Sequence, residues 1–209
     1  TNLTHQGDFR VTSTMFSREI RECTVGILGC GRIGLTTAKL FKGLGARVVG
    51  YDVYQSEAAK QVVEFLPLDE FLKQSDIISC HMPYIKGQNE NFINEEFISK
   101  MKDHAILVNT ARGEVLDLEA AVKAIENNKL DGLAIDVIAN EKSLFFKNFE
   151  NGKMDTPLHQ KLIDLYPRIL ITPHVASSTD KALNDMIEVS LQNMDEYLNT
   201  GKCKNSLIK

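Results

Sequence analysis

The amino-acid sequence predicts an α/β domain built on a doubly wound parallel sheet. Short apolar runs alternate with helical or turn segments, at residues 24–28, 47–51, 76–80, 105–109, 132–137 and 169–172. Such alternation is typical of parallel sheets, whose strands are apolar throughout because helices cover both faces. A glycine-rich turn after the first run and a long amphipathic stretch near the end of the chain complete the pattern.

Composition and charge narrow the classes of partner. The 209-residue chain is 43% hydrophobic, which suffices for a core, and it carries a net charge of −4. An acidic chain without a dense basic stretch argues against nucleic acid or an anionic membrane as the main partner. The sequence shows no apolar stretch near the ~18 residues of a membrane span and no signal-peptide pattern. We therefore expect a small-molecule partner.

The cysteines indicate the compartment. Cys23, Cys30, Cys80 and Cys203 lie far apart and without CxxC spacing. Such spacing disfavours both a disulfide framework and a zinc site, and nothing else in the sequence suggests a metal. We expect a cytoplasmic protein that binds no metal.

The first predicted unit is a strand, a tight turn and a helix over residues 24–45. Gly29 permits the turn, Gly31 lets the backbone approach a pyrophosphate, and Gly34 lets the helix lie close to the strand. The phosphates would then sit at the positive end of the helix dipole. The residues of this turn expected to contact a dinucleotide are Gly29, Gly31, Arg32, Ile33 and Gly34.

Asp52 identifies the dinucleotide. It ends the second apolar run, eighteen residues after Gly34. A carboxylate there can bind both ribose hydroxyls and repel a 2′-phosphate, so the expected cofactor is NAD rather than NADP. A GxGxxG turn alone also occurs in ordinary α/β domains. Here the preceding strand, the following helix and the acidic residue together favour dinucleotide binding.

The later elements have recognisable boundaries. Asp117 is the expected N-cap of a helix that Asn127 and Asn128 close. Residues 138–158 form a loop far longer than the ~2–6 residues usual in α/β connections, and such loops are often functional. The long helix over residues 179–198 carries one apolar face that needs a covering surface. The apolar residues of this face are Leu183, Met186, Ile187, Leu191, Met194 and Leu198.

Chemically capable side chains follow the last three strands. In open α/β sheets ligands bind beyond the carboxyl ends of the strands. Arg112 follows one run, Asp136 and Glu141 follow the next, and His174 follows the last. Taken singly, Arg112 and Glu141 have an ordinary explanation as solvated side chains and His174 as a strand-end cap. Together they favour a catalytic set, because they converge on the edge that the dinucleotide motif marks.

The segment between these residues and the glycine turn adds to the predicted cofactor site. For His81 we favour a structural role over direct contact with the cofactor. Pro83 is expected to shape the loop near the adenosine. Thr110 and Ala111, directly before Arg112, are also expected beside the cofactor.

Several motifs together resemble the D-isomer-specific 2-hydroxyacid dehydrogenases, and the resemblance covers nearly the whole chain. Within the family, the length and phenylalanines of the loop after Asp136 are most similar to the D-lactate and (R)-2-hydroxyglutarate branch. The matching segments are GCGRIG with Asp52, HMP at 81–83, LVNTARGEVLD at 107–117, GLAIDV at 132–137 with Glu141, and ITPH at 171–174.

The resemblance implies a role for each residue. Arg112 matches the arginine that binds the substrate carboxylate and polarises the carbonyl, and His174 matches the proton-transfer histidine. Glu141 matches its carboxylate partner, which orients an imidazole and favours its protonated form. Asp136 matches an aspartate near the nicotinamide.

The implied reaction is hydride transfer between NAD(H) and a small 2-oxo acid, with pyruvate and D-lactate as the first choice. (R)-2-hydroxyglutarate or another substrate of the branch is the alternative. An NAD-sensing, corepressor-like interaction module on the same fold is a further one. The residues after His174 read VASST at 175–179, where D-lactate dehydrogenases tend to have a bulkier aromatic pair, and this leaves the substrate open. Glu141 disfavours the formate dehydrogenase branch, which uses glutamine.

The resemblance also implies a division of the chain. Residues 1–178 would form a Rossmann-like NAD-binding domain, with 1–22 as a lead-in. Residues 179–209 would dock on a substrate domain, which the family places before the dinucleotide domain and which is absent from this chain. We accordingly expect the chain alone to be inactive. The family resemblance also suggests a homodimer formed through the dinucleotide domains.

Overall fold

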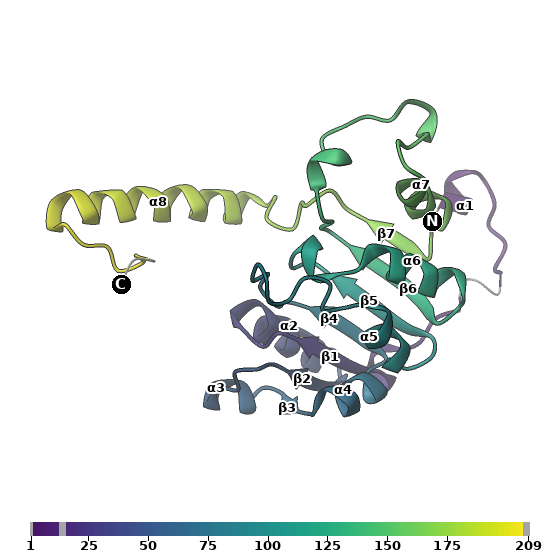
Figure 1. The fold of residues 1–209 in the computed structure, drawn as a ribbon, viewed down its shortest axis with the longest axis horizontal. Coiled ribbons are helices and arrows are strands. Elements are labelled where there is room, and N and C mark those ends of the chain that lie inside the picture. Colours follow the sequence, from purple (N-terminus) through teal and green to yellow (C-terminus); the bar gives the residue numbers. More distant parts are fainter. Residues whose placement is uncertain (1, 13–15, 207–209) are drawn as a thin grey trace.

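Seven parallel strands form one sheet in the computed structural model, which describes residues 2–12 and 16–206 (Figure 1). The strand order is β3-β2-β1-β4-β5-β6-β7, and this confirms the predicted doubly wound fold class. The chain order changes direction between β1 and β4, the place where such sheets bind ligands. The strands are β1 (Thr24–Leu28), β2 (Arg47–Tyr51), β3 (Glu64–Phe65), β4 (Ile77–Cys80), β5 (Ala105–Asn109), β6 (Leu130–Ile135) and β7 (Ile169–Ile171).

The predicted strands agree with the observed ones except at some ends. The runs at 24–28, 47–51 and 105–109 coincide with β1, β2 and β5, whereas β6 lies two residues earlier than the run at 132–137. Strands β4 and β7 are each one residue shorter than predicted. Strand β3 was not predicted, because two residues show no periodicity. It pairs only with β2, through Glu64 and Phe65.

Helices pack on both faces of the sheet. Val25 and Ile27 of β1 lie in one apolar cluster with Ala38 of α2 (Arg32–Gly43). Leu28 faces the other way, into a larger cluster that includes Phe71 of α4. The helices that contribute to this larger cluster are α4 (Leu68–Gln74), α5 (Glu95–Lys100), α6 (Leu118–Glu126) and α7 (Pro157–Asp164). As predicted, Asp117 caps α6 by accepting a hydrogen bond from the Ala120 amide at 3.0 Å. The short α3 (Glu57–Lys60) follows β2.

One part of the sheet is incompletely covered. On the face that α2 covers near β1 and β2, Ile106, Val108 and Ala134 of β5 and β6 are only partly buried. Leu170 of β7 is 51% exposed on the same face, whereas its neighbour Ile169 is buried on the other. Apolar strand residues are therefore open to solvent over β5 to β7.

The last helix, α8 (Asp180–Thr200), extends away from the sheet (Figure 1). Thr179 caps it by accepting a hydrogen bond from the Ala182 amide at 3.2 Å, and Gly201 ends it at a φ of 66°. The predicted helix is thus confirmed and runs two residues further. None of its residues is buried. Its exposed apolar residues include Leu183, Met186, Ile187, Leu191, Met194 and Leu198.

The lead-in is more structured than its lack of periodicity suggested. It contains α1 (Asn2–His5) and a 3-10 helix, η2 (Ile20–Glu22). Residues 1 and 13–15 of the predicted lead-in and 207–209 of the predicted tail lie outside the described residues.

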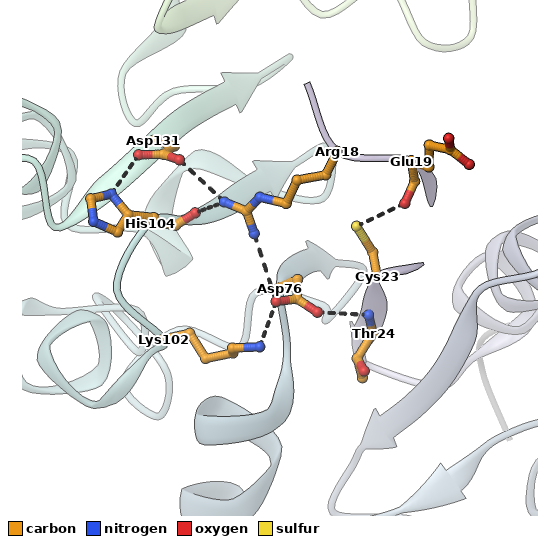
Figure 2. A network of polar contacts seen from close by, with 8 residues as sticks. All are labelled: Arg18, Glu19, Cys23, Thr24, Asp76, Lys102, His104 and Asp131. Atoms are coloured by element: carbon orange, nitrogen blue, oxygen red, sulfur yellow. Dashed lines mark hydrogen bonds and ion pairs between the residues drawn. The ribbon is translucent and has the colours of Figure 1, made fainter. Parts of the chain in front are cut away.

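Arg18 fastens the end of the lead-in to the amino-terminal edge of the sheet (Figure 2). Its guanidinium pairs with Asp131 at 3.1 Å and with Asp76 at 3.6 Å, and donates to the carbonyl of His104. Asp76 also accepts from Lys102 at 2.5 Å and from the first amide of β1 at 2.8 Å. Burial alone would raise the pKa of Asp76, but these partners outweigh it and lower the pKa.

Candidate active site

Two glycines of the first turn are required by close packing. A side chain at Gly29, whose φ is 93°, would place Cβ 2.6 Å from the Met82 amide nitrogen. At Gly34 the Cβ would lie 2.1 Å from the carbonyl oxygen of Gly29. Gly31 differs, because a Cβ there would meet nothing within 4 Å. The open space at Gly31 adjoins the first residue of the twelve-residue α2 and fits an approaching phosphate.

Asp52 is oriented by the same turn. One carboxylate oxygen accepts from the Cys30 amide at 2.6 Å, and the other accepts from the Tyr54 amide at 2.9 Å. Asp52 lines a cavity of about 260 Å³ together with Gly29 and Pro83.

A second cavity extends toward Arg112. It has a volume of about 290 Å³, and its lining residues include Ile33, His81, Thr110, Ala111 and Arg112. Met82 and Pro83 line both cavities, so the two are neighbours along the carboxyl edge of the sheet. Arg32 lines neither cavity and has an exposed side chain.

The imidazole of His81 contacts the preceding strand β4. Its Nε2 lies 2.9 Å from the hydroxyl oxygen of Ser79. Burial lowers the pKa of His81, which favours a neutral ring. The structural role predicted for His81 agrees with this contact, although the ring also lines the second cavity.

His174 and Glu141 form a pair. His174 Nδ1 lies 2.9 Å from Glu141 Oε2, and the two side chains are 41% and 29% exposed. The backbone of His174 is in the left-handed region at a φ of 52°, which is uncommon for a residue other than glycine. Its amide donates to the carbonyl oxygen of Asp136 at 2.8 Å and holds this conformation.

The loop that carries Glu141 is anchored by its apolar residues. Leu144 and Phe145 are buried in the larger apolar cluster. The Phe145 amide donates to the Glu141 carbonyl oxygen at 2.7 Å, so burial of Phe145 fixes the position of Glu141. Phe146, in contrast, is exposed.

Comparison with known proteins places this geometry in a family. Residues 1–176 match the profile of the D-isomer specific 2-hydroxyacid dehydrogenases, NAD binding domain. The chain belongs to this family. The expected cofactor, NAD, agrees with the domain that the profile describes.

Individual relatives of this dehydrogenase domain are similar over nearly all of the chain. A D-lactate dehydrogenase of Treponema pallidum is 40% identical over 94% of this chain and 59% of its own length. An aromatic 2-oxoacid reductase of Clostridium sporogenes is 37% identical over 91% of this chain and 57% of its own. The crystal structure of D-lactate dehydrogenase with NAD+ from Lactobacillus jensenii has a TM-score of 0.88 at 33% identity, covering 100% of this chain and 62% of that one. The chain thus spans about three fifths of the length of these relatives.

Asp136 supports the histidine segment of the dehydrogenase domain. Its carboxylate accepts from the Thr172 hydroxyl at 2.5 Å and from the amides of Val175 and Ala176 at 3.0 and 3.1 Å. Burial would raise the pKa of Asp136, yet these hydrogen bonds and the nearby His174 outweigh it and lower the pKa. The aspartate predicted beside the nicotinamide therefore holds the residues around His174, and it lines neither cavity.

Some residues of the site were not predicted. Tyr84, Ile85 and Asn89 line one or the other cavity from the loop after β4. Their positions depend on hydrogen bonds within the loop, such as that from the Asn89 amide group to the Pro83 carbonyl at 2.7 Å, which no spacing rule indicates. Asn109 was also missed, although a polar residue ending an apolar strand was a visible signal.

Residues 2–12 and 16–206 contain neither a membrane-spanning helix nor a cluster of metal-binding side chains. No helix there is both long and apolar enough to cross a membrane. No group of three or more His, Cys, Asp or Glu side chains there could hold a metal ion.

Proposed function

We propose that this domain serves an NAD-dependent dehydrogenase that interconverts a 2-oxo acid and an (R)-2-hydroxy acid, with pyruvate and D-lactate as the preferred pair. The observation that carries the proposal is the 2.9 Å contact between His174 and Glu141, at the sheet edge that also holds the glycine turn and Arg112. The D-lactate dehydrogenases among the relatives support this substrate pair.

The side chains divide the chemistry. NADH, when bound, supplies the hydride that the 2-oxo carbon accepts. Glu141 holds Nδ1 of His174, which leaves Nε2 to donate a proton to the carbonyl oxygen in reduction and to accept one in oxidation. Arg112 offers a planar guanidinium that binds the substrate carboxylate in a bidentate manner. Its side chain is exposed and, among the residues that the structure describes, donates only to the adjacent Ala111 carbonyl, so it is available to a ligand.

Asp52 is proposed to select NAD over NADP. Its carboxylate lies beside the glycine turn, where it accepts hydrogen bonds from the Cys30 and Tyr54 amides and lines the first cavity. A negative charge fixed there repels a 2′-phosphate.

A second domain is proposed to complete the substrate pocket. The pair of His174 and Glu141 is open to solvent, and hydride transfer needs a site that excludes water. The exposed apolar face of α8 supports docking of this helix on that domain.

The proposed homodimer is supported by the exposed Phe9, Val11 and Phe16 of the lead-in. Four free thiols suit a cytoplasmic location.

Two readouts on the full-length protein test this function. The first is NADH oxidation with pyruvate, 2-oxoglutarate and phenylpyruvate, where we expect pyruvate to give the highest kcat/KM. A higher kcat/KM for 2-oxoglutarate would make 2-oxoglutarate, and not pyruvate, the preferred substrate. NADH binding without turnover of any 2-oxo acid would favour an NAD-sensing module instead.

The second readout is His174→Ala. We expect turnover to fall ~10²–10⁴-fold, as for loss of a general acid, while the Kd of NADH stays within twofold. His159→Ala, on α7, is the matched control and should keep turnover. A loss below tenfold in His174→Ala would show that another group moves the proton.

A further inference from the structure

We propose that Asn109 is a positioning residue that holds the Arg112 turn in place. The proposal rests on the proposed function, in which Arg112 binds the acid. Asn109 ends β5, and its side chain is wholly buried after four apolar residues. Burying an amide in such surroundings is costly unless hydrogen bonds satisfy it.

Both ends of the Asn109 amide bind the turn. Its Oδ1 accepts from the Ala111 amide at 3.1 Å, and its Nδ2 donates to the Arg112 carbonyl oxygen at 2.9 Å. The side chain therefore bridges the backbone on either side of the Ala111–Arg112 peptide unit. These two bonds determine the direction in which the Arg112 side chain leaves the sheet edge.

Only an amide can make both bonds. One bond needs an acceptor and the other needs a donor, and a carboxamide supplies the two at this spacing. An aspartate would keep the acceptor but set a carboxylate oxygen against the Arg112 carbonyl oxygen. An alanine would leave the Ala111 amide without this partner.

The other end of the turn is held by close packing. A Cβ at Gly113 would lie 1.9 Å from the carbonyl carbon of Ile138 and 2.2 Å from the amide nitrogen of Ala139. This backbone contact leads into Glu141 within the same loop, so the Arg112 turn rests against the segment that positions the catalytic pair. A displaced turn would misplace the guanidinium relative to His174, and misplacement by ~1 Å can cost ~10²-fold in rate.

If Asn109 positions Arg112, replacing it should weaken binding of the substrate acid more than binding of the cofactor. Asn109 lines neither cavity. Asp52 and the glycine turn follow β2 and β1, which β4 separates from β5 in the sheet. In the full-length protein, Asn109→Asp and Asn109→Ala should raise the KM for pyruvate at least tenfold. The Kd of NADH should rise by a clearly smaller factor than the KM, although Thr110 and Ala111 of the same turn line the second cavity. Ser75→Ala is the matched control, because Ser75 is also wholly buried and its hydroxyl donates to the Phe71 carbonyl far from the site.

Amide hydrogen exchange in the 209-residue chain gives a second readout without activity. Exchange at the Ala111 amide should accelerate at least tenfold in Asn109→Ala and stay slow in Asn109→Asp, which keeps the acceptor. An unchanged KM in both variants would overturn the proposal, and so would equal rises of KM and NADH Kd. If the wild-type protein reduced no 2-oxo acid, the proposed function would fail by itself. Unchanged Ala111 exchange in Asn109→Ala would then still overturn the role of Asn109.

Discussion

His174 Nδ1 lies 2.9 Å from Glu141 Oε2, although the two residues are 33 positions apart in the chain. They follow the adjacent strands β6 and β7, so the sheet brings together what the sequence separates. The contact orients the imidazole through Nδ1, and no other described side chain is hydrogen-bonded to Nε2, the atom proposed to transfer the proton. Glu141 should therefore affect the rate of catalysis by orienting the imidazole of His174.

Glu141→Gln should lower kcat/KM for pyruvate reduction about tenfold, because a hydrogen bond to a charged group contributes ~1.5–3 kcal/mol. Reduction requires proton donation from the imidazole, which glutamine orients less firmly than glutamate does. Glu150→Gln, an exposed glutamate of the same loop, should leave the rate unchanged. An unchanged rate in Glu141→Gln would separate Glu141 from the proton transfer.

Gly31→Val tests the path of the pyrophosphate. The Cβ at Gly31 would meet nothing, and the φ of −75° suits any residue, so the fold should lose only about 1 kcal/mol of N-cap preference. The new side chain would fill the space that the phosphates need, and the Kd of NADH should rise at least tenfold. Gly43→Ala, also in open space at the end of α2, should bind NADH normally. Wild-type affinity in Gly31→Val would contradict the proposed path.

Asp52→Asn tests the cofactor preference. Removing the charge while keeping one acceptor should weaken NADH about tenfold, since hydrogen bonds to charged groups contribute ~1.5–3 kcal/mol. The ratio of the NADPH and NADH dissociation constants, measured by fluorescence titration, should fall. Asp69→Asn on α4 should change neither constant. Equal affinity of the wild-type chain for both cofactors would contradict the assignment to Asp52.

Much of this site could be predicted because strand ends determine it. Arg112, Glu141 and His174 follow apolar runs, and parallel strands bring their carboxyl ends to one edge. Strand β3 and the cavity-lining residues that follow Pro83 in the loop after β4 could not be predicted. Two residues carry no periodicity, and that loop is held by hydrogen bonds such as the one from Tyr84 to Glu90 at 2.8 Å.

The network around Arg18 was missed for a similar reason. The two aspartates that bind Arg18, Asp76 and Asp131, lie 55 residues apart in the chain, and they approach one guanidinium only once the strands are paired. A charged residue beside a strand is usually a solvated one, so local sequence offered no signal. The hydrogen bonds of Asp136 to residues 172–176 could not be predicted either, because they depend on the pairing of β6 with β7.

Asp76→Asn tests whether this network stabilises the fold. At pH 7 the variant should lose about 1.5–3 kcal/mol in the free energy of unfolding. The pKa of Asp76 is lowered in the folded state, so its stabilisation is complete above the unfolded value near 3.9 and is lost as pH falls through the folded value. Urea unfolding from pH 7 to pH 3 should show the wild-type and variant stabilities converging below about pH 4. A constant gap down to pH 3 would contradict the pairing. Asp103→Asn, an exposed partner of Lys129, should cost little.

We predict that this chain holds the complete dinucleotide site and that a second domain supplies the opposite wall of the substrate pocket. The most direct test is to titrate NADH into the purified 209-residue chain, then add millimolar pyruvate and follow NADH absorbance, with the full-length protein measured in parallel. We predict saturable NADH binding by the chain and turnover only by the full-length protein. Failure of the folded chain to bind NADH, or turnover by the chain comparable to that of the full-length protein, would contradict the account.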